Sequence, residues 1–314
     1  MKTGNITLVI PVYNRERLIG RTLDSVAAQT WRPLRLILVD NGSTDGSPAL
    51  CEAFRRKYAA DDFHIDILSE TRPGAACARN CGLAACATSY VYFFDSDDEL
   101  SPDFIECMER IIGCDAPDLI VFPTNEVKGG RICRRPYAAS GKSSVQILNS
   151  MLTTQSMLFR TDWLRRLGGW NERLSIWMDW ELGVRALLAS PVIRWYDRQA
   201  FHRIHIHPDS ITGRTYAARY EKLMLTMQQV RKETDESDGS EEEKKKNNTA
   251  LYFRQMILSA KLMGEYAPEA SADCLRRARR GFPADIRTRL YGRFLYEYTR
   301  WGGRGAWRLA LLLL

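Results

Sequence analysis

Long apolar runs are absent from this chain. No stretch of about 18 consecutive apolar residues occurs, so we expect no membrane-spanning helix. The first residues lack the charged and apolar regions of a secretory leader, because the apolar run at 6–12 already contains Pro11. Eight cysteines are present, but the spacing of Cys77, Cys81 and Cys86 fits no common zinc pattern. We therefore expect free thiols in a reducing cytoplasm.

Acidic residues are in deficit, since 45 lysines and arginines outnumber 38 aspartates and glutamates. The resulting net charge of +7 suits anionic partners such as nucleotides, phospholipid surfaces or nucleic acid. No nucleic-acid-binding motif accompanies the charge, so nucleic acid is not expected as a partner. With 314 residues, the chain is long enough for one large domain with an appendage, or for two domains.

Strand-like and helix-like segments alternate through residues 1–122. Apolar, β-branched runs predict strands, and periodic runs between them predict helices. The expected strands are 6–12, 34–39, 63–68, 90–94 and 119–122, and the expected helices are 15–29, 46–58, 75–87 and 102–112. This alternation predicts an α/β fold, in which a mostly parallel sheet lies between helices on both faces. Ligands of such sheets bind beyond the carboxyl ends of the strands.

Carboxylates gather at the end of the fourth expected strand. The run Tyr-Val-Tyr-Phe-Phe at 90–94 leads directly into Asp95, Asp97 and Asp98. Crowded carboxylates repel one another unless a cation lies among them, and Mg²⁺ or Mn²⁺ prefers oxygen ligands and also holds phosphates. The pattern thus favours a phosphorylated ligand bound through a metal. The alternative is a polar turn that caps the helix expected after Ser101.

Two other strand ends carry candidate binding residues. Pro11 turns the chain outward near the end of the first strand, and Tyr13 then offers a flat face on which a nucleobase can stack. Asp40 ends the second strand and can accept hydrogen bonds from a base or from ribose hydroxyls. The alternatives are a tyrosine at the rim of the core and a turn that only caps a helix.

Taken in order, four motifs of this chain resemble those of the inverting family 2 glycosyltransferases of the GT-A fold. They are Val9–Asn14, Val39–Asp45, Gly74–Asn80 and Phe94–Asp98, and the resemblance covers roughly residues 5–215. It implies a GT-A, Rossmann-like fold and a nucleoside diphosphate sugar, such as a UDP- or GDP-sugar, as donor. The nucleotide-sugar-binding residues implied are Pro11, Tyr13, Asp40, Arg72, Arg79, Asn80, Asp95 and Asp97.

The metal ligands implied by the resemblance are Asp97, Asp98 and His207, and the direct carboxylate ligand is left open between Asp97 and Asp98. His207 begins a His-x-x-Ser segment, in which the family's histidine approaches the metal or the diphosphate. His202 and His205 have no such support and are expected to be structural or exposed. The alternative for this histidine cluster is a zinc site.

A second cluster resembles the family's acceptor-side segment. It comprises Leu167–Glu172 and Trp177–Leu182, and its acceptor-side residues are Trp170, Glu172, Trp180 and Glu181. Asp179 aligns with the family's catalytic aspartate. Because Met178 replaces a glutamate, the base is left open between Asp179 and Glu181, and we favour Asp179. The alternative is that Asp179 only caps the helix expected at 180–189.

The expected domains are a catalytic domain at 1–215, with a nucleotide-sugar half at 1–122 and an acceptor half at 123–215, followed by a C-terminal extension. The extension is expected as a helix at 216–232, a flexible acidic and basic linker at 233–249 without apolar residues, and a basic helical region at 250–314. Residues 145–190 are expected to form helices and loops, and 192–207 one or two strands.

The last part of the chain is strongly basic. Residues 273–308 contain ten arginines against three acidic residues, with aromatic residues between them. This composition suits an anionic membrane surface through 273–314, and hence peripheral attachment at the inner membrane face. The alternative is a helical appendage with a solvated arginine face.

These features predict a cytoplasmic, metal-dependent, inverting glycosyltransferase of cell-surface polysaccharide synthesis, with a glycan or lipid-linked acceptor. A nucleotidyltransferase shares the carboxylates and the nucleotide site, but it usually carries a Gly-rich basic loop where this chain has Pro-Val-Tyr-Asn at 11–14. A catalytically inactive sugar-nucleotide-binding module is the other alternative. The presence of both the acidic cluster and Asp179 favours an enzyme.

Overall fold

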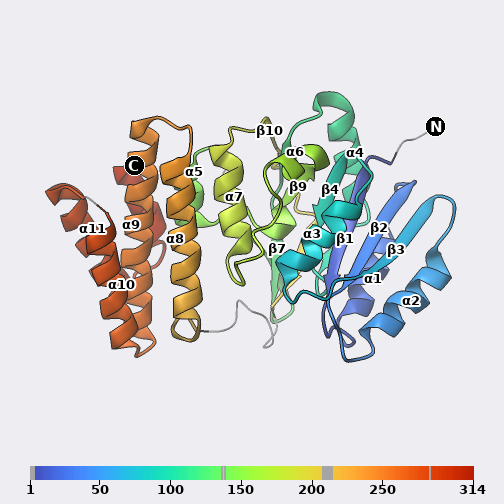
Figure 1. The fold of residues 1–314 in the computed structure, drawn as a ribbon, viewed down its shortest axis with the longest axis horizontal. Coiled ribbons are helices and arrows are strands. Elements are labelled where there is room, and N and C mark those ends of the chain that lie inside the picture. The colour runs from blue at the N-terminus through green and yellow to red at the C-terminus, as the bar shows by residue number, and fades with distance from the viewer. Residues whose placement is uncertain (1–3, 136, 138, 207–214, 283) are drawn as a thin grey trace. The chain divides into compact units, whose positions relative to one another are not determined.

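The five expected strands all form in the computed structural model, which describes residues 4–135, 137, 139–206, 215–282 and 284–314 (Figure 1). They lie in one seven-stranded sheet of order β10-β6-β9-β4-β1-β2-β3. Its strands are β1 (Ile6–Val12), β2 (Leu34–Asp40), β3 (Phe63–Ser69), β4 (Tyr90–Phe93), β6 (Leu119–Val121), β9 (Met157–Arg160) and β10 (Ile193–Trp195). Only β9 pairs antiparallel with its neighbours, so the prediction of a mostly parallel sheet is confirmed.

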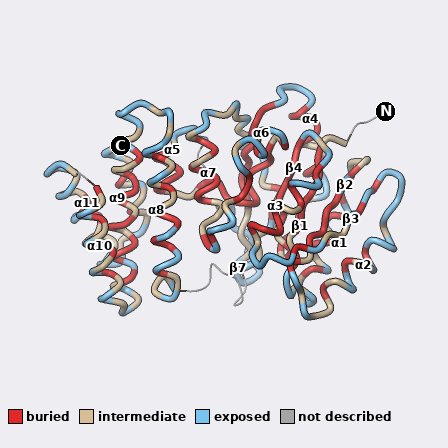
Figure 2. The backbone as a smooth tube through the Cα atoms, in the orientation of Figure 1, coloured by how far each residue is buried: buried red, intermediate tan, exposed pale blue. Residues whose placement is uncertain are grey.

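Helices cover both faces of this sheet, as expected. They are α1 (Ile19–Ala27), α2 (Ser47–Tyr58), α3 (Ala75–Ala85), α4 (Phe104–Asp115) and the short α6 (Thr161–Arg166). Side chains alternate across a strand, so Leu8 and Ile10 pack with Ile19 of α1 on one face. Val9 faces α3 on the other, where Gly82 lacks the Cβ that would overlap it. The central strands β1 and β4 are consequently buried almost throughout (Figure 2), whereas the edge strands β3 and β10 keep exposed residues.

Strand β9 contradicts the expectation of only helices and loops over 145–190. Its four residues are too few to show a period, and their strand conformation comes from pairing with β4 and β6. A short 3-10 helix, η1 (Thr154–Ser156), precedes it. Four further strands form a second sheet of order β5-β11-β7-β8. They are β5 (Glu99–Leu100), β11 (His202–His205), β7 (Asn125–Lys128) and β8 (Arg131–Arg134).

The chain divides into two compact units. The first comprises Met1–Ala139, Leu152–Ser175 and Pro191–His207, and the second comprises Ser140–Met151, Ile176–Ser190 and Pro208–Leu314. The second unit therefore includes three segments that were predicted to belong to the catalytic domain, at 140–151, 176–190 and 208–215. Its helices are α5 (Ser143–Asn149), α7 (Met178–Leu188), η3 (Ala217–Arg219), α8 (Tyr220–Glu236), α9 (Glu241–Gly264), α10 (Pro268–Gly281), α11 (Ile286–Arg300), α12 (Ala306–Ala310) and η4 (Leu311–Leu313).

The flexible linker expected at 233–249 is wrong. Helix α8 continues to Glu236, and α9 begins at Glu241. Ser240 accepts a hydrogen bond from the backbone of Glu243 at 3.2 Å, and acidic residues fill the first turn of α9 beside its positive end. Further along α9, from Ala250 onward, one face of the helix is buried. The first turns contain no apolar residues, and the packing of the later turns therefore stabilises the helix as a whole. Among the described residues, no helix is long and apolar enough to cross a membrane.

Candidate functional site

The ends of β4, β1 and β2 lie side by side, because these strands are neighbours and parallel. Asp95 follows β4, Tyr13 follows β1, and Asp40 is the last residue of β2, paired in register with Val12. Tyr13 keeps 57% of its surface exposed, so its ring is open to a ligand. The sheet thus brings three residues expected at the nucleotide to one edge.

The three clustered carboxylates differ in their surroundings. Asp98 is 1% exposed, and it accepts hydrogen bonds from the His205 backbone at 2.9 Å and from Gln155 at 3.2 Å. Burial, together with the charges of Asp95 and Asp97, raises the pKa of Asp98 to about 8. Asp97 keeps 19% of its side chain exposed and has Arg15 Nε at 3.8 Å. Asp97 is therefore the more accessible of the two carboxylates left open by the sequence.

Gln155 is a site residue that sequence analysis did not find. It lies in η1 and donates to both Asp95 and Asp98, which ties the acidic turn to the segment before β9. Glutamine in a polar Thr-Thr-Gln-Ser run carries no motif of its own, so only the fold reveals its position. Arg21, which donates to the Asp97 carbonyl at 2.5 Å, was missed for the same reason.

Arg79 lies where the sequence placed it, next to the acidic turn. Its guanidinium donates to Asp95 Oδ1 at 2.7 Å and lies over the Trp170 ring at 4.5 Å from its centroid. Trp170 is 2% exposed and also packs edge-on against Phe93. A ring buried to this extent cannot contact an acceptor, so the expected acceptor-side role of Trp170 is corrected to one of holding Arg79.

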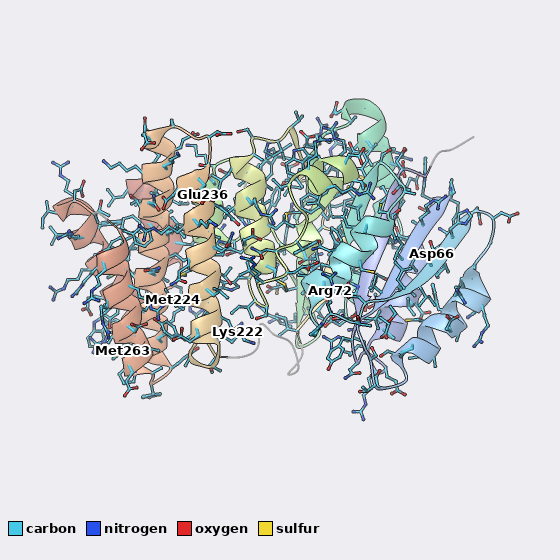
Figure 3. All side chains as sticks on the ribbon, viewed as in Figure 1. Asp66, Arg72, Lys222, Met224, Glu236 and Met263 are labelled. Carbon is cyan, nitrogen blue, oxygen red and sulfur yellow. The ribbon has the colours of Figure 1, made fainter. Side chains whose placement is uncertain are left out.

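Arg72, in the loop before α3 (Figure 3), forms a second group with Asn80 and Glu172. Arg72 donates to Glu172 at 2.7 Å and to Glu70 at 2.8 Å, and these carboxylates raise its pKa further. Asn80 donates to Glu172 at 3.0 Å and to the Trp170 carbonyl at 2.9 Å. Asn41 fixes the same loop by donating to the Arg72 carbonyl at 2.8 Å. Two of the expected nucleotide-sugar residues, Arg72 and Asn80, thus share one hydrogen-bonded network with Glu172.

The described residues form no complete metal site. Within the described ranges, no three His, Cys, Asp or Glu side chains gather closely enough to hold a metal ion. His207, the expected third ligand, lies outside the described residues. His202 is fully buried, and burial lowers its pKa to about 3, so it is neutral and hydrogen-bonded to Tyr92 at 2.8 Å. Asp97, the more accessible of the two carboxylates expected as ligands, carries the hard oxygen donors that Mg²⁺ or Mn²⁺ prefers.

Asp179 lies in the second unit, in the first turn of α7, and its Oδ1 accepts from the Trp180 backbone at 2.9 Å. Glu181, left open as the alternative base, is completely buried and pairs with Arg185 at 2.7 Å. Trp180 is also buried, and its ring lies against Arg254. Acceptor-side roles for Glu181 and Trp180 are therefore corrected to structural ones, because neither side chain is accessible.

Comparison with known proteins agrees with this geometry. Residues 7–167 match the model of a family described as glycosyl transferase family 2. The chain is 32% identical over 158 residues to glycosyltransferase GlyA of Streptococcus pneumoniae, an alignment that covers 48% of this chain and 22% of GlyA. It is 31% identical over 153 residues to the minor teichoic acid biosynthesis protein GgaA of Bacillus subtilis, covering 46% of this chain and 33% of GgaA.

The alignments thus span a third or less of these two relatives. Among solved structures, Staphylococcus aureus TarS 1–349 in complex with UDP-GlcNAc matches with a TM-score of 0.68 at 18% identity, covering 97% of this chain and 90% of that one. Mannosyltransferase PcManGT of Pyrobaculum calidifontis, in complex with GDP-Man and Mn²⁺, matches with a TM-score of 0.59 at 17% identity, covering 98% and 86%. These matches confirm the GT-A fold.

Proposed function

This chain belongs to glycosyltransferase family 2, and we propose that it transfers a sugar, with inversion, from a nucleoside diphosphate sugar to a glycan or lipid-linked acceptor of cell-surface polysaccharide synthesis. The observation that carries the proposal is the common edge formed by Tyr13, Asp40 and Asp95 at three neighbouring parallel strands. The teichoic acid relative GgaA and the nucleotide-sugar complex of TarS support the class of reaction.

The donor's parts have matching groups in the first unit. Tyr13 offers an exposed ring to the base, and Asp40 accepts from the base or the ribose. Arg79, fixed by Asp95 and Trp170, holds a positive charge beside the acidic turn, where a diphosphate carries negative charge. Arg72, in the loop before α3, offers a second positive charge to the diphosphate.

Asp97 is the proposed direct carboxylate ligand of Mg²⁺ or Mn²⁺, because both carboxylate oxygens of Asp98 already accept hydrogen bonds from the protein. His207 is proposed as a further ligand from its place in the His-x-x-Ser motif. When bound, the cation neutralises the diphosphate leaving group. Asp98 has an indirect, positioning role, because it accepts a hydrogen bond from Gln155, which also donates to Asp95.

Asp179 is the proposed general base. It removes the proton from an acceptor hydroxyl, whose oxygen attacks the anomeric carbon as the bond to the diphosphate breaks. One displacement of this kind inverts the anomeric centre, and no covalent intermediate forms. The burial of Glu181 favours Asp179, which is only partly buried.

A panel of UDP- and GDP-sugars, incubated with the protein, Mn²⁺ and water or a crude acceptor fraction, tests the proposal. Release of the nucleoside diphosphate, with a product of inverted anomeric configuration by NMR, is the expected result. Release of pyrophosphate from a nucleoside triphosphate would indicate a nucleotidyltransferase instead. Binding of nucleotide sugars without any turnover would indicate an inactive binding module.

Peripheral attachment to an anionic membrane at the cytoplasmic face is the second part of the proposal. On α11, Ile286, Leu290 and Phe294 follow one another at intervals of four residues and are 70%, 64% and 48% exposed. Residues four apart share one helix face, so these form an outward apolar stripe. Arg287, Arg289 and Arg293 on the same helix are exposed as well. Apolar side chains flanked by arginines suit an anionic lipid surface.

A further inference from the structure

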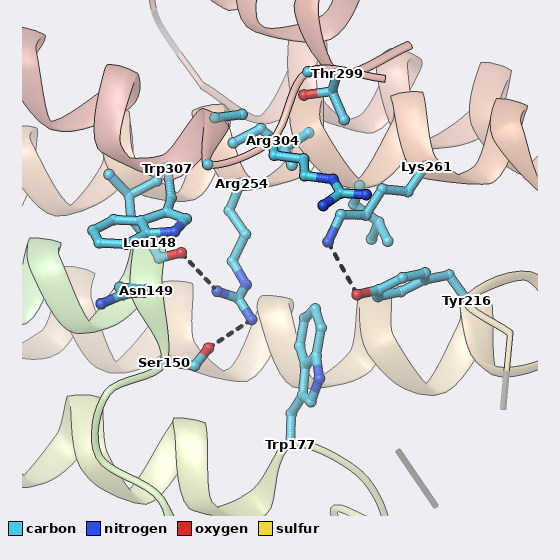
Figure 4. A pocket seen from close by; sticks show the side chains of 15 residues that line it. Leu148, Asn149, Ser150, Trp177, Tyr216, Arg254, Lys261, Thr299, Arg304 and Trp307 are labelled. Carbon is cyan, nitrogen blue, oxygen red and sulfur yellow. Dashed lines mark hydrogen bonds between the residues drawn. The ribbon is translucent and has the colours of Figure 1, made fainter. Parts of the chain in front are cut away.

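A pocket of 510 Å³ opens within the second unit (Figure 4). Its walls come from helix α9, from residues 148–150 at the end of α5, from the glycine-containing turn at 303–305, and from Trp177 and Tyr216. The pocket is therefore built by segments far apart in the sequence, which the helical packing brings together.

The charge of the lining has one sign. Arg254, Lys261 and Arg304 line the pocket, and none of its described lining residues is acidic. Lys261 Nζ donates to the Tyr216 hydroxyl at 3.0 Å, which holds the ammonium group at the wall. Arg304 is exposed and carries no ion pair among the described residues. Three cations in a lining that contains no carboxylate favour an anionic ligand.

Arg254 is the fixed member of the group. Its guanidinium lies over the rings of Trp177 and Trp180, at 4.2 and 4.4 Å from their centroids. It donates to the Ile147 carbonyl at 2.7 Å and to Ser150 Oγ at 3.0 Å, whereas its buried Nε has no partner. Burial lowers the pKa of Arg254 only to about 10, so it stays charged at neutral pH.

The pocket also adjoins the proposed base. Trp177, a lining residue, is the N-cap of α7, and Asp179 stands in the first turn of that helix. The charge of Asp179 acts on Arg254 and raises its pKa against the effect of burial. Trp177 and Trp307 add aromatic walls, against which the apolar face of a sugar or polyol packs.

We propose that this pocket binds a phosphate group of the acceptor, so that the acceptor is a phosphate-bearing polyol or saccharide. This inference rests on the proposed glycosyl transfer, since it names the acceptor class of the same reaction. A phosphodiester-linked polyol chain and a lipid-linked diphosphate present the same chemistry, namely phosphate oxygens next to hydroxyl-bearing carbons. Lys261 and Arg304 supply the adaptable charges, and Arg254 the fixed one.

Isothermal titration of the full chain with a short glycerol phosphate oligomer, with farnesyl diphosphate and with an unphosphorylated glycerol oligomer tests the inference. The test variant is Lys261→Gln/Arg304→Gln, which spares Arg254 and its structural contacts. The matched control, Lys222→Gln/Lys232→Gln, removes two charges from exposed positions of α8 in the same unit. Figure 3 labels Lys222. Stronger binding of the oligomer or of the diphosphate identifies the source of the phosphate.

The phosphorylated probe is expected to bind the wild type and the control variant alike, and to bind the test variant about tenfold or more weakly, because charge-assisted contacts to phosphate are lost. The unphosphorylated oligomer is expected to give no heat. Equal weakening in both double variants, or no binding of either phosphorylated probe to the wild type, would overturn the inference. Titration of UDP with Mn²⁺ in the same samples separates its failure from failure of the proposed function, because that binding does not involve the pocket.

Discussion

Arg79 Nη2 and Asp95 Oδ1 lie 2.7 Å apart, and the arginine is 6% exposed. The pair joins helix α3 to the end of β4, while the Trp170 ring covers the face of the guanidinium. A buried arginine held on two sides cannot swing away, so its charge stays at the sheet edge before any ligand arrives. This fixed cation beside an acidic turn is the central feature of the proposed donor site.

Replacing Arg79 by lysine keeps the charge but removes the planar group that stacks on Trp170. We expect Arg79→Lys to weaken UDP or GDP binding in Mn²⁺ by about tenfold, because lysine cannot keep both the bond to Asp95 and the stacking on Trp170 that fix the charge at the site. Calorimetric titration measures the affinity, and a circular dichroism melt checks that the variant is folded. Unaltered nucleotide affinity in a folded variant would remove Arg79 from the donor site.

Asp179→Asn and Glu181→Gln separate the two carboxylates of α7. We expect Asp179→Asn to slow sugar transfer by about a hundredfold or more while nucleotide binding persists, because a general base is lost. Glu181→Gln breaks a buried pair with Arg185 and is expected to cost about 3 kcal/mol of stability, with turnover per folded molecule nearly kept. The opposite pattern, slow transfer only in Glu181→Gln, would reassign the base.

Glu233 gives the second unit a pH-dependent stability. Burial and the neighbouring Glu181 raise its pKa from 4.5 to about 8, although Gln229 and Arg185 act in the other direction. When folding raises the pKa of a carboxyl group, the free energy of unfolding falls as the pH rises from the pKa of the unfolded state towards that of the folded state. Glu233→Gln should therefore raise the melting temperature little at pH 5 and increasingly towards pH 8.5. A difference in melting temperature between Glu233→Gln and the wild type that stays constant from pH 5 to pH 8.5 would contradict this assignment.

Membrane attachment is tested on the apolar stripe rather than by truncation. Deleting 273–314 would remove Cys274, Ala278, Leu295 and Ala310, all of which are buried in the core of the second unit. Ile286→Ser/Leu290→Ser/Phe294→Ser changes only exposed positions, and we expect it to lose flotation with anionic liposomes. Leu225→Ser, at an exposed apolar position of α8, is the control. Flotation of the triple variant at the wild-type level would refute the attachment.

The first half of the fold was predictable from sequence because β1 and β4 are buried apolar runs, while β3 alternates apolar and exposed residues with the period of a half-buried strand. Strand β9 was not, since a four-residue strand shows no period and owes its conformation to its partners. The prediction of a linker at 233–249 was wrong because composition was taken as evidence of disorder. The composition of this segment resembles a solvated linker, but a capping box and a buried face further along α9 stabilise it as helix.

The site divides in the same way. Asp95, Arg79 and Asp40 stand in motifs at strand and helix ends, so their positions followed from topology. Gln155 stands in no motif, and the burial of Trp170 depends on tertiary packing that a single sequence does not encode locally. Trp170 and Glu181 were placed by resemblance alone, which preserves position in a motif but does not report accessibility.

The most direct test of the central claim is titration of UDP and GDP into the wild type, Asp97→Asn and Asp66→Asn, each with and without Mn²⁺. Asp66 is exposed on β3 and serves as the charge-matched control (Figure 3). We predict that one nucleotide binds the wild type and Asp66→Asn only with Mn²⁺, and that Asp97→Asn loses this binding. Equal affinity of all three proteins, or binding indifferent to Mn²⁺, would contradict a donor site built on a metal at the acidic turn.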